Sequence, residues 1–286
     1  VVCQSTTDIG EIVKFNNYKI DVSAYLNSLG FLSKNILDIG VNAGTPWLYE
    51  GFSSSSFHLI DPILDDEHVK KNIAKYTKQA RNHNTYKFYT TAIMNEICTK
   101  QFNVYSDPGR NSFFEMSQSD CPDGVNFINN IEVVCTTLED FIDKSDITGN
   151  FGLKIDCEGG EKDVIQSGKM KFKDCEFVII ETPINERFID GNTFADIVLL
   201  LHEKGLGFFN FLPTDWVSNP KFHDCLFINY KSHLFDSKNP NTELKRYLNK
   251  AEVLLKSFDR TKETQTLNDF RELLEKIQNL VNIDKI

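Results

Sequence analysis

The stretch NILDIGVNAGTPWLYE, Asn35 to Glu50, decides the fold of this chain. The apolar residues before Gly40 predict a short buried strand, and Pro46 suits the first turn of a helix, where its missing N–H would have no partner. The loop between strand and helix carries Gly40, Asn42 and Gly44. A strand, a glycine-containing turn and a helix in succession are typical of a nucleotide-binding α/β protein.

The residue in the middle of this loop narrows the class of ligand. A dinucleotide-binding loop reads G-x-G-x-x-G, because its middle glycine lets the backbone approach a pyrophosphate. Asn42 stands at that position, where its side chain crowds a pyrophosphate but can hydrogen-bond a smaller group, such as the amino-acid part of S-adenosylmethionine. Asp61 ends the next predicted strand, where a carboxylate can accept hydrogen bonds from both ribose hydroxyls. Asn42 and Asp61 together favour S-adenosylmethionine over NAD as the ligand.

Short β-rich runs alternate with helical stretches from about residue 35 to residue 230, which predicts an α/β domain with a mostly parallel sheet. We expect three parts: an N-terminal extension or helical lead-in over 1–34, the ligand-binding domain over 35–237 and an α-helical hairpin over 238–286. The predicted strands are residues 35–39, 57–60, 86–93, 131–135, 151–155, 176–181, 206–211 and 224–229. The segment from 107 to 130 reads as an irregular excursion that could cover a site.

The C-terminal hairpin is predicted from two amphipathic repeats on either side of a polar linker. The same pattern fits a hairpin packed on its own domain and a homodimer contact, because both need one apolar stripe. The apolar positions are Leu244, Tyr247, Ala251, Leu254 and Phe258 in the first helix and Leu267, Phe270, Leu274, Ile277 and Val281 in the second.

Composition excludes several classes of protein. The chain has 286 residues, 41% of them hydrophobic, which is enough for one large α/β domain with an appendage. A formal net charge of -10 disfavours nucleic acid as a partner, and the apolar runs are too short to span a membrane. Seven cysteines without a C-x-x-C spacing predict reduced thiols and a cytoplasmic location. The start of the chain shows no signal peptide, and the chain could be a fragment.

A second group of polar residues follows the strand predicted at 151–155. Asp156 ends this strand, and Glu158 and Glu161 follow as a new helix begins. Ligands of open α/β sheets bind beyond the carboxyl ends of the strands, so Asp156 is expected to face the same crevice as Gly40. It could bind a substrate, take its proton or ligate a metal. A favourable interaction with the helix dipole explains Glu158 and Glu161 equally well.

Glu181 ends the following strand. Glu181 is expected either to assist Asp156 in the reaction or simply to be a solvent-exposed residue at the end of its strand. Nothing in the sequence indicates a metal; if a divalent cation binds, Asp156 and Glu181 would be its ligands, because hard cations prefer oxygen.

Three motifs in this order resemble the FkbM family of S-adenosylmethionine-dependent methyltransferases. They are DIGVNAG at 38–44, IDP at 60–62 and LKIDCEGGE at 153–161. The sequence departs from the family pattern at Asp61, where Glu is usual, and at Gly160, where a small apolar residue is usual. The resemblance covers about residues 35–230 and implies a Rossmann-like class I fold with about seven strands, the last one antiparallel.

The resemblance also implies roles for individual residues. Gly40, Asn42 and Gly44 would hold the methionine part of the cofactor and Asp61 its ribose. Asp38 would orient the loop or meet the amino group of the cofactor. The other implied contacts are Ala92 and Ile93 with adenine, and Asp156 with the transferred methyl group and the acceptor, with Glu158 close by.

The expected reaction is in-line transfer of a methyl group to a hydroxyl of a sugar, a glycan or a secondary metabolite, with a carboxylate drawing off the proton. Asp156 is the expected base, and Glu158 or Glu181 would assist it. Two alternatives stay open at this point: an NAD(P)-dependent oxidoreductase, and a non-catalytic methyltransferase-like subunit that serves assembly.

Overall fold

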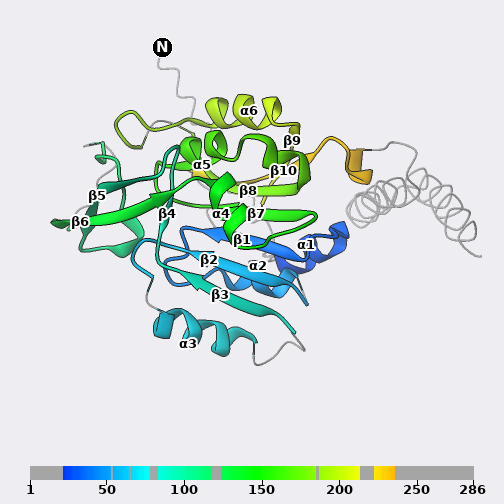
Figure 1. The fold of residues 1–286 in the computed structure, drawn as a ribbon, viewed down its shortest axis with the longest axis horizontal. Helices are drawn as coiled ribbons and strands as arrows, with labels where there is room; N and C mark the ends of the chain where they lie inside the picture. The colour runs from blue at the N-terminus through cyan, green and yellow to red at the C-terminus, as the bar shows by residue number, and fades with distance from the viewer. Residues whose placement is uncertain are drawn as a thin grey trace, which may run out of the picture.

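A computed structural model describes residues 22–52, 54–64, 66–77, 83–117, 124–184, 187–212 and 222–235. The predicted C-terminal hairpin, residues 238–286, and residues 1–21 of the predicted extension lie outside these ranges. At the centre is a seven-stranded sheet with the order β3-β2-β1-β7-β8-β10-β9 (Figure 1). Its strands are β1 (Asn35–Ile39), β2 (Ser56–Ile60), β3 (Thr85–Tyr89), β7 (Phe151–Ile155), β8 (Cys175–Pro183), β9 (Leu206–Phe211) and β10 (Phe222–Asn229).

Most neighbouring strands of this sheet run parallel. β7 is the middle strand of the sheet, and β1 beside it pairs in parallel with β2 on one side and β7 on the other. β10 is antiparallel to both β8 and β9. Every residue of β7 is buried. This burial suits a parallel strand that is covered by helices on both faces. The predicted mainly parallel sheet with a late antiparallel strand is therefore confirmed.

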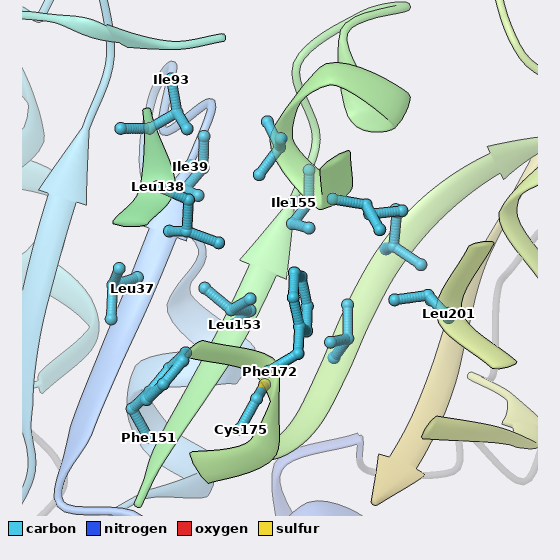
Figure 2. Packing of buried hydrophobic residues seen from close by; sticks show 14 of the residues in the cluster. Leu37, Ile39, Ile93, Leu138, Phe151, Leu153, Ile155, Phe172, Cys175 and Leu201 are labelled. Atoms are coloured by element: carbon cyan, nitrogen blue, oxygen red, sulfur yellow. The ribbon is translucent and has the colours of Figure 1, made fainter. Parts of the chain in front are cut away.

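Six helices cover the two faces of the sheet, three on each within the described residues (Figure 1). The apolar core on the α4–α6 side is centred on β7, whose Leu153 and Ile155 lie beside Phe172 (Figure 2). The core on the other side contains Phe57 and Phe177. The helices are α1 (Val22–Leu29), α2 (Pro46–Gly51), α3 (Asp66–Thr77), α4 (Leu138–Lys144), α5 (Glu161–Ser167) and α6 (Phe194–Glu203).

A second sheet of three strands corrects two of the predicted strands. It consists of β4 (Ala92–Ile93), β6 (Phe127–Thr136) and β5 (Cys98–Tyr105), in that order across the sheet. The strand predicted at 86–93 is divided between β3 in the main sheet and β4 in the second. The strand predicted at 131–135 is part of β6 and does not join the main sheet. Most of β6 is exposed, which explains why it forms an antiparallel ribbon with β5.

The second sheet stands beside the carboxyl ends of the main strands, on the left in Figure 1. A short 3₁₀ helix, η1 (Pro108–Arg110), follows β5. Met116 then forms an isolated bridge with Phe188, beyond the end of β8. The predicted excursion is therefore held against the main domain at this bridge, and it forms one side of the region where a ligand is expected.

Candidate active site

The loop after β1 has a backbone that only particular residues allow. Gly40 has a φ of 82°, and a Cβ there would lie 1.7 Å from the carbonyl oxygen of Asp156. Any side chain would therefore push the ends of β1 and β7 apart. Asn42 also has a positive φ, 44°, which asparagine tolerates better than most residues. Its N–H donates to Oδ2 of Asp61 at 3.0 Å, so the loop and the tip of β2 are joined directly.

Two of the residues predicted to bind the cofactor, Asp38 in β1 and Gly44 in the loop, lie beside Tyr49. Asp38 is fully buried, and its Oδ2 accepts a hydrogen bond of 2.6 Å from the hydroxyl of Tyr49. Burial raises the pKa of Asp38, although Lys154 and Tyr49 act in the opposite direction. Gly44 has a φ of 95°, a backbone conformation that favours glycine, and it lies next to the ring of Tyr49. Asp38 and Gly44 are thus placed to support the loop, and neither lines the cavity described next.

A cavity of about 430 Å³ opens at the carboxyl ends of β1, β2 and β7. This volume is within the range of small-molecule sites, about 300–1,000 Å³. Gly40, Asn42 and Asp61 line one part of it. The predicted adenine contacts Ala92 and Ile93 also line it, and Asp156 and Glu158 lie along it as well. The structure therefore brings together seven of the ten predicted site residues around one space.

The wall opposite the loop comes from the second sheet and the residues that follow it. Its apolar side chains are suited to an aromatic base. The sequence reasoning did not find this wall, because it had no reason to separate β4, β5 and β6 from the main sheet. The wall residues are Met94, Phe102, Val104, Tyr105, Pro108, Asn111 and Phe113.

Three carboxylates gather at the far end of this cavity. Asp156, Glu158 and Glu181 each offer an oxygen atom, and these atoms lie within 4.8 Å of one another. Arg187 donates from Nη1 to Glu181 at 2.9 Å and from Nη2 to Glu158 at 3.2 Å. Its guanidinium also lies 4.5 Å from the ring centre of Phe222, a cation–π contact. Glu181 itself does not line the cavity and lies behind the other two acids.

The surroundings of these carboxylates change their acidity. Burial raises the pKa of Glu158 to about 7; Arg187 acts against this rise, and the charge of Asp156 adds to it. Burial and the charges of Asp156 and Glu158 raise the pKa of Glu181 well above its ordinary value. A carboxyl with a pKa near neutrality can exchange a proton with a ligand at physiological pH.

A buried lysine lies under this group. Lys154, in the middle of β7, is 3% exposed, and its Nζ lies 2.6 Å from Oδ2 of Asp156. On the neighbouring strand β1, the residue directly opposite Lys154 is Asp38. Burial alone would lower the pKa of Lys154, but Asp156, Asp38 and Asp224 raise it above its ordinary value. Lys154 therefore carries its positive charge in the core, where it forms an ion pair with Asp156.

The oxygen atoms of Asp156, Glu158 and Glu181 are the donors that a hard cation prefers. Arg187, however, already forms ion pairs with Glu158 and Glu181. Lys154 forms one with Asp156. Within the residues that the structure describes, the cluster thus has two cationic partners of its own, Arg187 and Lys154.

Sequence reasoning missed Lys154, Arg187 and Asp224. Lys154 could have been found, because a charged residue inside an otherwise apolar strand needs a partner. Arg187 and Asp224 carry no comparable signal in the sequence: their closeness to Glu181 depends on the path of the chain after β8 and on the antiparallel pairing of β10 with β8.

The sheet order, the late antiparallel strand and a cavity beyond the carboxyl ends of the central strands define the Rossmann-like fold of class I methyltransferases. Residues 38–208 match the family described as methyltransferase FkbM domain. The chain belongs to this family. No curated protein sequence matches the chain.

Solved structures resemble the chain at low sequence identity. A methyltransferase FkbM from Methylobacillus flagellatus KT has 11% identity and a TM-score of 0.40; the match covers 68% of this chain and 43% of that one. A magnesium protoporphyrin IX methyltransferase from Synechocystis PCC 6803 with bound SAM has 11% identity and a TM-score of 0.35, covering 73% and 76%. An uncharacterized protein from Listeria monocytogenes serotype 4b has 12% identity and a TM-score of 0.35, covering 92% and 96%. The chain thus spans less than half of the Methylobacillus protein.

Proposed function

We propose that this protein is an S-adenosylmethionine-dependent O-methyltransferase that acts on a hydroxyl of a sugar, a glycan or a secondary metabolite. One observation carries the proposal: a single cavity has Asn42 and Asp61 at one part and the carboxylates of Asp156 and Glu158 at another. When bound, S-adenosylmethionine would supply a methyl group that a nucleophile can accept. The membership in the FkbM family supports the same class of reaction.

The donors in the cavity fit this cofactor. Asp61 offers carboxylate oxygens for ribose hydroxyls, and Asn42 offers an amide for the polar amino-acid part. The wall around Ile93, Met94 and Phe102 is apolar and suits the adenine ring. A pyrophosphate would instead meet Asp61 and the Asn42 side chain, which is why NAD is disfavoured.

Two observations support Glu158, in place of Asp156, as the group that takes the proton of the acceptor hydroxyl. Asp156 already accepts a hydrogen bond from Lys154 at 2.6 Å, so one of its two oxygens is engaged by the protein. Burial raises the pKa of Glu158 to about 7, and this residue lines the cavity. Asp156 would then orient the hydroxyl, and Glu181 with Arg187 would hold Glu158 in place. The protein would act in the cytoplasm.

Calorimetry with S-adenosylmethionine, S-adenosylhomocysteine and NAD separates the proposed cofactor from the alternative. We expect the first two to bind and NAD to leave no signal. Binding of NAD alone would contradict the proposal and favour an oxidoreductase.

Methyl transfer is then tested by mass spectrometry of sugars, glycans and hydroxylated metabolites for a product with one added CH2. Glu158→Gln and Asp156→Asn are expected to lose transfer by about 100-fold or more, since a positioned base contributes about 10²–10⁴. Both should keep their affinity for S-adenosylhomocysteine. Asp140→Asn, on the surface of α4, is the control and should transfer as the unmodified chain does. Full transfer by Glu158→Gln would refute the assignment of the base, and cofactor binding without any transfer would favour a non-catalytic subunit.

A further inference from the structure

Two cysteines of the second sheet face each other. Cys98 on β5 and Cys135 on β6 are direct partners in the antiparallel register. Such partners have Cα atoms about 4.5 or 5.5 Å apart, and both separations are within the range of about 4.4–6.8 Å that a disulfide needs. The two side chains pack in the same apolar cluster, and the Cys98 thiol hydrogen-bonds that of Cys135.

The two thiols differ in their surroundings. Cys98 is partly exposed, whereas Cys135 is fully buried. Burial raises the pKa of Cys135 to about 12, and the neighbouring Cys98 adds to the rise. Because Cys98 is the more exposed of the two thiols, an external oxidant meets Cys98 first and Cys135 reacts second. Cys175 and Cys225, by contrast, stand opposite Phe151 and Ile180 in the main sheet.

We propose that Cys98 and Cys135 form a reversible disulfide that joins β5 to β6 behind the cavity wall. The oxidant is a low-molecular-weight disulfide such as oxidised glutathione. The Cys98 thiol gives up its proton and attacks one sulfur of the oxidant, which releases one thiolate and leaves a mixed disulfide. Cys135 then loses its proton and attacks Sγ of Cys98, which releases the second thiolate. The two released thiolates take up the two protons, so two protein thiols are oxidised and one small disulfide is reduced to two thiols.

The proposed disulfide would lie next to strands that line the cavity. The other edge of β6 pairs with β4, where Ala92 is the register partner of Cys135. Ala92 lines the cavity, as does Phe102 of β5. A disulfide would therefore fix β5, which lines the cavity, to β6, the strand that joins it to β4. The bond also restricts the unfolded chain, and we expect the midpoint of thermal unfolding to rise by about 4 to 8 °C.

The experiment uses the full chain treated with excess oxidised glutathione and then with dithiothreitol. Digestion without reductant should yield a peptide pair joined through Cys98 and Cys135, and dithiothreitol should separate the pair. Oxidation should raise the unfolding midpoint of the unmodified chain and leave that of Cys98→Ser unchanged. Cys225→Ser is the matched control, because its cysteine has no cysteine opposite it, and it should still form the joined pair.

Two results would overturn the proposal. One is glutathione attached to Cys98 without any joined pair, which would mean that Cys135 cannot complete the exchange. The other is a joined pair without a rise in the unfolding midpoint, which would mean that the bond does not stabilise the wall. Neither result depends on the acceptor or on methyl transfer, so this proposal can fail while the proposed function stands.

Discussion

Lys154→Met removes the buried positive charge under the acidic group while keeping most of the volume of the side chain. Lys154 is 3% exposed and interacts with Asp156, Asp38 and Asp224. Without it, these acids keep their negative charges in the core with less compensation. We therefore expect the variant to unfold more easily, even though methionine is the more apolar residue.

The size of the effect follows from the burial of this pair. Removing one partner of a buried ion pair costs about 3–5 kcal/mol. The Asp156 side chain is 30% exposed, so water compensates part of the loss. The expected decrease in the free energy of unfolding is therefore at the lower end, about 3 kcal/mol at about pH 8.

The decrease should become smaller in acid. Burial raises the pKa of Asp224 to about 6, and Lys154 keeps it from rising further. Without Lys154 this pKa is higher still, so the folded variant binds more protons than the unfolded chain does. Its stability therefore rises as the pH falls through the folded-state pKa, and we expect less than half of the loss at about pH 5.5.

Urea unfolding of both proteins at these two pH values is the assay. Lys144→Met is the matched control, because Lys144 forms an exposed pair with Asp140 on α4 at 2.8 Å. Pairs of this kind contribute about 0.3–0.5 kcal/mol. An equal loss for Lys154→Met at both pH values would refute the role of its charge, and a loss no larger than that of the control would refute the role of its burial.

Two further predictions concern the loop after β1. Gly40→Ala should lower the free energy of unfolding by more than about 4 kcal/mol in urea, because its Cβ would lie 1.7 Å from the Asp156 carbonyl oxygen; a near-normal urea midpoint would contradict this geometry. Asp61→Asn should weaken binding of S-adenosylhomocysteine about tenfold in calorimetry, since it loses a charged acceptor for ribose hydroxyls. Unchanged affinity would mean that Asp61 only supports the loop through Asn42.

Most of the main sheet could be predicted from the sequence, because its strands are short apolar runs that local patterns reveal. β1 and β7 were predicted with the bounds that the structure has. The second sheet could not be predicted, because nothing local distinguishes the end of β3 from the start of β4 except Thr90 and Thr91. Which sheet β6 joins depends on its pairing with β5, a contact between distant residues.

Residues of the candidate site could be predicted where a single segment shows both the end of a strand and a polar side chain that can bind a ligand. Asn42 and Asp61 are examples, since each follows a strand whose end is visible in the sequence. The same reasoning placed Asp156 at a strand end but did not show that Lys154 donates a hydrogen bond to it, because the buried lysine two residues earlier was overlooked. Arg187 joins two acids that are 23 residues apart, Glu158 and Glu181. Its role arises only from the three-dimensional arrangement.

The pairing of β1 with β7 also affects how the chain folds during synthesis. Asn35 stands opposite Phe151, about 116 residues further along. At about 5–20 residues per second, a ribosome needs roughly 6 to 23 s to make the partner strand. During this time the backbone N–H and C=O groups along one edge of β1 have no partner strand, and such edges promote aggregation. The central position of β1, which places its loop at the cavity, therefore makes folding slow and exposes the nascent chain to self-association.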